Sequence, residues 1–184
     1  RTAHKFSELL ASSDNIHSKE DLEYWISTLP VAHLLGDGCG GLLTLSVVCK
    51  GRPSAADLSH THFTALTVKN ALCDAVRQLR GDRPYVDTTY AQVPLVGHCH
   101  ESSFTLYRCL HHGSLHERGY RTGSTIHKAA LKESLAAGLL LRAGWPQGNY
   151  TLVDPMAGSG TLVIEALLLA ADISPGLMRM QCGE

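Results

Sequence analysis

The sequence lacks a long apolar run and an excess of charge of either sign. Its longest apolar stretch, residues 162–171, is interrupted by Glu165 and is far shorter than the about 18 apolar residues of a membrane span. The formal net charge of −1 is not that of a domain that binds nucleic acid by bulk electrostatics. We therefore expect no membrane contact. Any binding of a nucleic acid must depend on a local group of basic residues and not on the net charge.

Regular cysteine spacing is also absent. The six cysteines form no Cys-x-x-Cys pair, which favours reduced thiols in an intracellular, cytoplasmic protein. The residues through Asn15 show neither a signal peptide nor a transit peptide. An organellar location stays open only if a transit peptide precedes Arg1. The His and Cys residues of 98–116 do not suit zinc, since strand alternation turns Cys99 away from His98 and His100. We predict no metal site.

The composition, 44% hydrophobic and 18% charged over 184 residues, is typical of a globular chain of one or two domains. Periodicity and capping residues predict helices over 18–29, 61–80, 125–142 and 162–171, with N-caps at Ser18, Thr61 and Thr125. β-rich segments predict strands over 42–48, 92–97, 103–109 and 150–153, the middle two as a hairpin. The sequence thus predicts an α/β fold.

A glycine-containing loop at residues 154–161 lies between the predicted strand 150–153 and the predicted helix 162–171. Glycines let a ligand approach the backbone, and a helix N-terminus offers unpaired N–H groups. The loop has no Lys before Thr161, which disfavours a triphosphate, and Val163 stands where a dinucleotide fingerprint needs glycine. Simple turns also contain Gly-x-Gly, so the spacing alone leaves a small-molecule site and a structural turn both open.

Longer motifs make the chain similar to a known family. These motifs are DPMAGSGT at 154–161, HTHFTAL at 60–66, RPYVDT at 83–88, LHERGYR at 115–121, LKESLAA at 131–137 and ISPGL at 173–177. In order and spacing they resemble the THUMP-domain RNA methyltransferases, most closely the large-subunit ribosomal RNA guanine-N2 methyltransferases. The resemblance implies a THUMP-like α/β RNA-binding region at 1–110, a connector at 111–125, and the N-terminal part of a Rossmann-like methyltransferase domain at 126–184.

The resemblance also implies a cofactor and a substrate. S-adenosyl-L-methionine would be bound by Asp154, Pro155, Met156, Ala157, Gly158, Ser159, Gly160 and Thr161, with RNA, ribosomal RNA in particular, as partner. The chain departs from the family pattern at Ala130, where a Pro is usual, and at Ala157, where Cys is common.

Family members of this type carry out catalysis with Asn or Asp followed by Pro-Pro-aromatic, and no Pro-Pro occurs in these residues. We therefore name no catalytic residue and expect the chain to be a fragment. Two alternatives remain: a non-catalytic RNA-binding THUMP module, and a fragment of a transfer RNA guanine-N2 methyltransferase.

Basic residues supply the candidate RNA contacts. Lys50 and Arg52 flank Gly51 after a predicted strand, where a glycine turn would present both cations together. The full set is Lys50, Arg52, Arg77, Arg80, Arg118 and Arg121, with Lys69 and Arg83 nearby. A cation on a helix is usually only solvated, and the two connector arginines would serve equally well in a structural interface.

Glu165 is a carboxylate in an otherwise apolar helix, so it needs a partner. We expect a hydrogen bond to the glycine loop or the neighbouring strand, in which case it could also fix the loop for the cofactor.

Overall fold

The computed structural model describes residues 1–35, 43–111, 113–121, 130–148 and 150–177. The chain divides into two compact units, which we call the sheet unit and the loop unit. The sheet unit spans residues 6–112, and the loop unit combines residues 1–5 with residues 113–184. The predicted connector thus falls, from Gly113 onward, within the loop unit.

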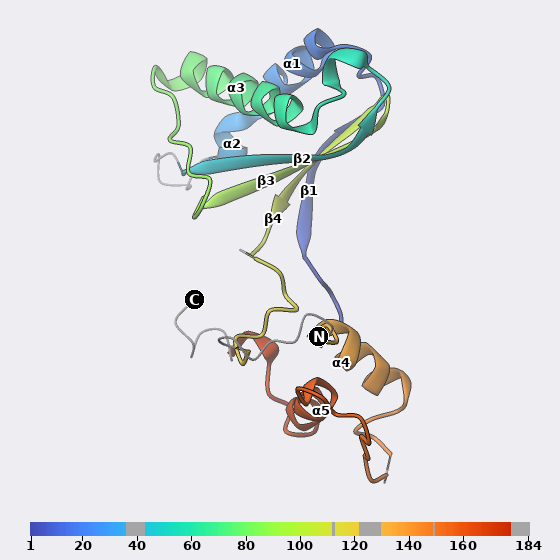
Figure 1. The fold of residues 1–184 in the computed structure, drawn as a ribbon. Helices are drawn as coiled ribbons and strands as arrows, with labels where there is room; N and C mark the ends of the chain where they lie inside the picture. The colour runs from blue at the N-terminus through green and yellow to red at the C-terminus, as the bar shows by residue number, and fades with distance from the viewer. Residues whose placement is uncertain (36–42, 112, 122–129, 149, 178–184) are drawn as a thin grey trace. The chain divides into compact units, whose positions relative to one another are not determined.

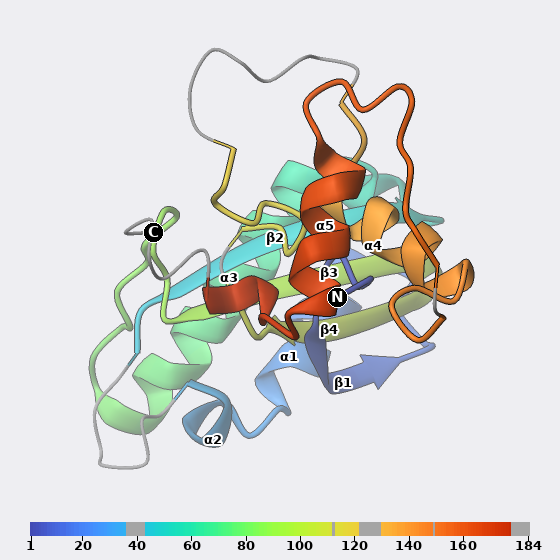
Figure 2. The ribbon, with the colours of Figure 1, turned by 90° about the horizontal axis from the view of Figure 1, so that it is seen from below.

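The sheet unit is built on four strands, β1 (Ser7–Ser13), β2 (Leu45–Pro53), β3 (Val93–Glu101) and β4 (Ser103–Cys109). Their order is β1-β4-β3-β2, with β2 parallel to β3 and the other pairs antiparallel. Figure 2 shows β1 and β2 at the two edges of this sheet. The predicted hairpin is confirmed as β3–β4, whereas β1 was not predicted, and both β2 and β3 extend beyond their predicted ends.

The helices of the sheet unit lie on one face of the sheet (Figure 1). They are α1 (Lys19–Ser27), α2 (Val31–Leu35) and α3 (Thr61–Arg80), and a 3-10 turn at Ala56–Leu58 precedes α3. Helix α3 packs on β2, and α1 and α2 pack on α3. The core between these layers holds the fully buried Leu22, Ile26, Leu72, Leu95 and Phe104.

Local capping explains where the helices begin. Ser18 is the N-cap of α1 and accepts a hydrogen bond from the Asp21 amide at 3.1 Å, as predicted. The Asp21 carboxylate in turn accepts from the His17 amide at 2.9 Å, which completes a reciprocal cap. The N-cap of α3 is His60, so the prediction of Thr61 was wrong by one residue.

Two glycines allow close packing within the sheet unit. A Cβ on Gly97 would lie 2.5 Å from a ring carbon of Phe104, and a Cβ on Gly51 would lie 1.9 Å from the Cys99 carbonyl oxygen. Gly51 also has a φ of +99°, a backbone conformation that residues other than glycine rarely adopt. Because Gly51 lies inside β2 and pairs with Cys99, the predicted turn at Lys50–Arg52 was wrong.

In the described part of the loop unit, α4 (Glu133–Arg142) and α5 (Thr161–Ala170) pack on each other through Leu140, Ala166 and Leu169. Helix α5 begins at the glycine loop as predicted. The predicted start of α4 was wrong: residues 130–132 are not helical, and Thr125 lies outside the described residues. Residues 150–153 form no strand, because a strand needs a partner and the described part of this unit offers none.

Candidate functional site

The glycine loop leads directly into α5. Gly160 is the N-cap of the helix with a φ of +74°, and Gly158 has a φ of +54°. A turn is closed by the Gly160 amide, which donates to the Ala157 carbonyl at 2.8 Å, and by the Met156 amide, which donates to Asp154 Oδ1 at 3.2 Å. A Cβ on either glycine would come no closer than 3.9 Å to another residue, so it is the left-handed backbone that requires them.

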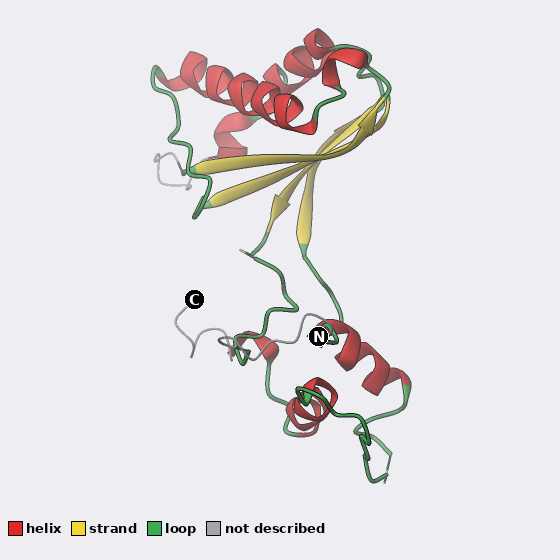
Figure 3. Ribbon diagram, in the orientation of Figure 1, coloured by secondary structure: helices red, strands yellow, loops and turns green. Residues whose placement is uncertain are grey.

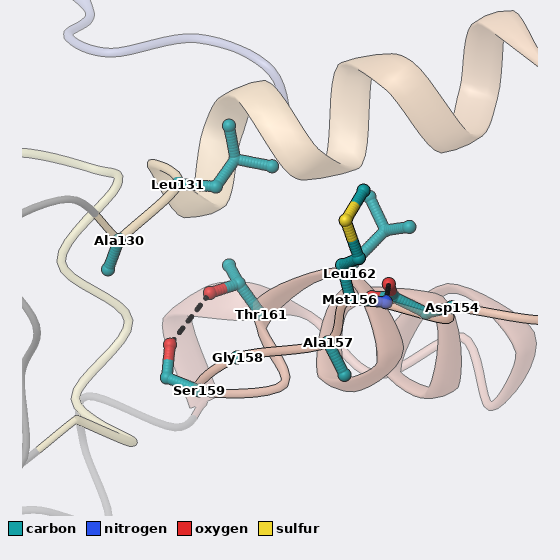
Figure 4. A pocket seen from close by; sticks show the side chains of 9 residues that line it. All are labelled: Ala130, Leu131, Asp154, Met156, Ala157, Gly158, Ser159, Thr161 and Leu162. Atoms are coloured by element: carbon teal, nitrogen blue, oxygen red, sulfur yellow. Dashed lines mark hydrogen bonds between the residues drawn. The ribbon is translucent and has the colours of Figure 1, made fainter.

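A cavity of about 490 Å³ lies against this loop (Figure 4). Six of the eight residues predicted for the cofactor line it, while Pro155 and Gly160 belong to the loop without lining the cavity. Three further lining residues were not among those predicted to bind the cofactor. The complete lining is Ala130, Leu131, Asp154, Met156, Ala157, Gly158, Ser159, Thr161 and Leu162.

The lining suits a ligand without phosphate. It contains one carboxylate, Asp154, and neither Lys nor Arg, whereas phosphate sites usually add a cation to the backbone amides. Thr161 and Leu162 also belong to the first turn of α5. The unpaired amides of that turn therefore offer hydrogen bonds to a carboxylate on a ligand.

Arg121 joins the two walls of the cavity. One of its terminal nitrogens donates to the Leu131 carbonyl at 3.2 Å and also contacts the Thr161 hydroxyl, while the other lies 3.6 Å from Glu133. Its side chain is only 16% exposed. The arginine thus connects the approach to α4 with the start of α5, which favours the structural one of its two predicted roles.

Glu165 is completely buried in α5, and its partners come from elsewhere than predicted. Its Oε1 accepts from Arg118 Nε at 3.4 Å and from the Tyr120 hydroxyl at 3.0 Å. The expected bond to the glycine loop or to a neighbouring strand was therefore wrong. Burial, followed by the charge of Glu165, raises the pKa of Tyr120 well above its usual range, so this hydroxyl remains a donor.

Arg118 is 3% exposed. Besides Glu165, it donates to the carbonyls of Leu115 and Arg1, each at 2.6 Å. Of the two predicted roles for Arg118, these contacts favour the structural one, since its charge faces protein acceptors and not solvent.

The remaining RNA candidates lie in the sheet unit. Lys50 and Arg52 are exposed on β2, and Arg77 and Arg80 are exposed in the last turn of α3. Arg83 is exposed too, but its guanidinium pairs with Asp74, with Nε 3.1 Å from Oδ1. These positions show which cations solvent can reach.

Within the described ranges, no three His, Cys, Asp or Glu side chains gather as a metal site would require. The same residues include no helix with the length and apolar character needed to cross a bilayer.

Comparison with known proteins matches both parts of the chain. Residues 17–108 match the THUMP domain family, and residues 118–184 match the RMKL-like methyltransferase domain family. Proteins named ribosomal RNA large subunit methyltransferase K/L are 46% identical in Syntrophotalea carbinolica and 45% identical in Pseudomonas aeruginosa, each over 143 residues and 76% of this chain. The chain spans about a fifth of the length of these relatives, 20% and 19%.

Solved structures share the fold at lower identity. A Listeria monocytogenes protein, described as a predicted N6-adenine-specific DNA methylase, is 24% identical with a TM-score of 0.75 over 96% of this chain and 44% of its own. The SMU.472 protein, solved in complex with SAH, is 22% identical with a TM-score of 0.75 over 95% of this chain and 44% of its own. The chain belongs to the THUMP-domain proteins that carry an RMKL-like methyltransferase domain.

Proposed function

We propose that this chain is part of an RNA methyltransferase that uses S-adenosyl-L-methionine and modifies the exocyclic N2 of a guanine in large-subunit ribosomal RNA. The observation that carries the proposal is the cavity formed where the glycine loop enters α5. The names of the relatives at 45–46% identity support ribosomal RNA as the substrate, and the motif resemblance supports guanine N2.

The cavity suits S-adenosyl-L-methionine in size and chemistry. Its volume of about 490 Å³ lies within the range of about 300–1,000 Å³ that is usual for small-molecule sites. The first-turn amides of α5 would bind the cofactor's carboxylate, and Asp154 would accept hydrogen bonds from its amino or hydroxyl groups. Bound there, the cofactor supplies an activated methyl group.

The sheet unit would hold the RNA. Lys50, Arg52, Arg77 and Arg80 are its exposed candidates for phosphate contacts, and such contacts orient a nucleic acid without reading its sequence. The target guanine must leave its stack so that its amine can be aligned with the methyl group. The task of this unit is therefore to position the RNA strand.

Deletion of the gene tests the proposal. We expect large-subunit ribosomal RNA to lose one methyl group at N2 of a guanine, as seen by mass spectrometry of RNA digests. A lost methyl in transfer RNA would instead favour the transfer RNA enzyme, and unchanged RNA would favour a non-catalytic module.

Complementation then tests the cavity. Gly158→Ala should restore methylation poorly, because Gly158 lines the cavity at a φ of +54°. Gly144→Ala is the matched control: Gly144 has a φ of +83° and open space around it, but it does not line the cavity. Equal loss with both variants would show general backbone strain instead of a cofactor site.

A further inference from the structure

The sheet unit has one face that its own helices do not cover. Helices α1, α2 and α3 all lie on the opposite face (Figures 1 and 3). The side chains that point toward those helices include the buried Leu45, Cys49, Leu95 and Cys99. Because side chains alternate along a strand, the residues between them point to the other side, which we call the open face.

The cations Lys50 and Arg52 lie beside two histidines on the open face. Lys50 of β2 pairs in register with His98 of β3, and Arg52 pairs with His100. All four residues are exposed. Adjacent strands are about 4.8 Å apart, and alternate residues of one strand are about 6.6 Å apart, so the four side chains form a compact block of hydrogen-bond donors.

On the described strands β2, β3 and β4, the open face carries no opposing charge. None of its alternate positions on β2, β3 and β4 is Asp or Glu, although the chain as a whole has a net charge of −1. The acidic residues nearest in sequence fall between the open-face positions: Glu101 is the last residue of β3 and pairs with Pro53, and Glu8 contacts Arg108 at 3.7 Å. Such an arrangement complements a polyanion.

An aromatic platform lies beside the cations. The rings of His98 and Tyr107 meet edge to face, with centroids 5.5 Å apart and an interplanar angle of 79°. Tyr107 belongs to β4, one strand away from His98. Rings fixed on neighbouring strands can stack with unpaired bases, whereas the bases of a duplex are already stacked on each other.

We propose that the open face binds a single-stranded RNA segment, with its phosphates at Lys50 and Arg52 and a base against His98 and Tyr107. The inference rests on the proposed function and deepens it, because it places the RNA on the sheet and not at the end of α3. Exposed apolar side chains on the same face, such as Val48 at 53%, would then contact the sugars and bases between the phosphates.

Fluorescence anisotropy with a labelled single-stranded RNA of about 12 nucleotides, within the usual range of site sizes, tests the charges. In the 184-residue chain, K50Q/R52Q should weaken binding about tenfold at low salt and reduce the slope of log affinity against log salt by about 1.4, since each single-strand phosphate contact contributes about 0.7. R77Q/R80Q removes the same charge from α3 and should leave the affinity within about twofold.

The aromatic platform is tested separately. Y107L should weaken binding about fivefold or more, while Y107F, which keeps the ring, should bind as well as the unaltered chain. Y24L is the matched control, because Tyr24 is 74% exposed but lies on α1 among the helices. Circular dichroism checks that each variant keeps its fold.

The possible results separate the two proposals. If R77Q/R80Q loses affinity and K50Q/R52Q does not, RNA binds on the helical side: the inference fails and the proposed function stands. If the unaltered chain binds no RNA, the proposed RNA-binding function of the sheet unit fails as well. A dimer that K50Q/R52Q disrupts, measured by sedimentation in the absence of RNA, would assign the face to a second copy and overturn the inference.

Discussion

Loss of Arg118 should destabilise the loop unit strongly. In Arg118→Ala, the carboxylate of Glu165 would stay fully buried with only the Tyr120 hydroxyl, 3.0 Å away, as its remaining partner among the described contacts. Removing one member of a buried ion pair typically costs about 3–5 kcal/mol. The carbonyls of Leu115 and Arg1 would lose a donor at the same time, so we expect the upper part of that range.

Changing the carboxylate should cost less. Glu165→Gln keeps the size of the side chain and an oxygen that can accept from Tyr120, and Arg118 keeps its two carbonyl acceptors at 2.6 Å. We expect a loss of about 1–3 kcal/mol, typical of a weakened buried hydrogen bond. The double variant Arg118→Met/Glu165→Leu should be more stable than Arg118→Ala, because apolar residues can replace a buried ion pair at little cost.

Hydrogen exchange of the α5 amides, followed by mass spectrometry, is the appropriate assay because it reports the loop unit separately from the sheet unit. A protection loss below about 1 kcal/mol in Arg118→Ala would refute the reasoning. If that variant instead bound RNA more weakly with unchanged protection of α5, Arg118 would be an RNA contact, the other of its two predicted roles.

Three further predictions concern packing and thiol chemistry. Gly97→Ala should destabilise the sheet unit by about 1–3 kcal/mol in urea denaturation, because the new methyl group would collide with Phe104; unchanged stability would contradict the close packing. Gly138→Ala, in the middle of α4 with no contact closer than 3.7 Å, should stabilise that helix by about 0.5–1 kcal/mol, read from its amide exchange. Burial raises the pKa of Cys49 to about 12 and that of Cys99 to about 11, so site-resolved alkylation at pH 8 should label neither thiol until the chain unfolds, with only about one Cys49 in ten thousand ionised.

The same thiols make stability depend on alkaline pH. A pKa that is raised in the folded state means that the folded protein holds the proton more tightly than the unfolded chain does. The free energy of unfolding therefore has its full contribution from the protonated thiols below their ordinary pKa. This contribution is lost as the pH rises from about 9 toward 12, the pKa of Cys49 in the folded protein. Chemical denaturation at several alkaline pH values would show this loss, and a pH-independent midpoint would contradict it.

Features determined by neighbours in sequence could be predicted. The cap of α1 depends on Ser18 and Asp21, three residues apart, and α5 begins where Gly160 ends the loop. In both cases a few consecutive residues determine where the helix starts. They supply either the group that accepts from the first helical amides or the backbone conformation that leads into the helix. Helix boundaries of this kind needed no tertiary information.

Features that depend on distant partners could not be predicted. Strand β1 pairs with β4, about a hundred residues later, and its sequence SELLASS has no strong strand pattern of its own. The opposite error occurred at residues 150–153, which have β-forming side chains but no strand to pair with in the described part of the loop unit. Pairing decides whether such segments become strands.

Burial likewise separates arginines that the sequence makes look alike. The connector motif places Arg118 and Arg121 in a polar, glycine-containing segment. From the sequence alone, both could be exposed RNA contacts or parts of a structural interface. In the structure, both guanidinium groups contact acceptors inside the loop unit. Arg118 contacts Glu165 and two carbonyls, and Arg121 contacts Leu131, Thr161 and Glu133. A guanidinium already engaged in this way must break those bonds before it can meet a phosphate. On the proposed function, the charge that binds RNA should therefore come from exposed cations such as Lys50 and Arg52, while Arg121 connects two segments that line the cavity.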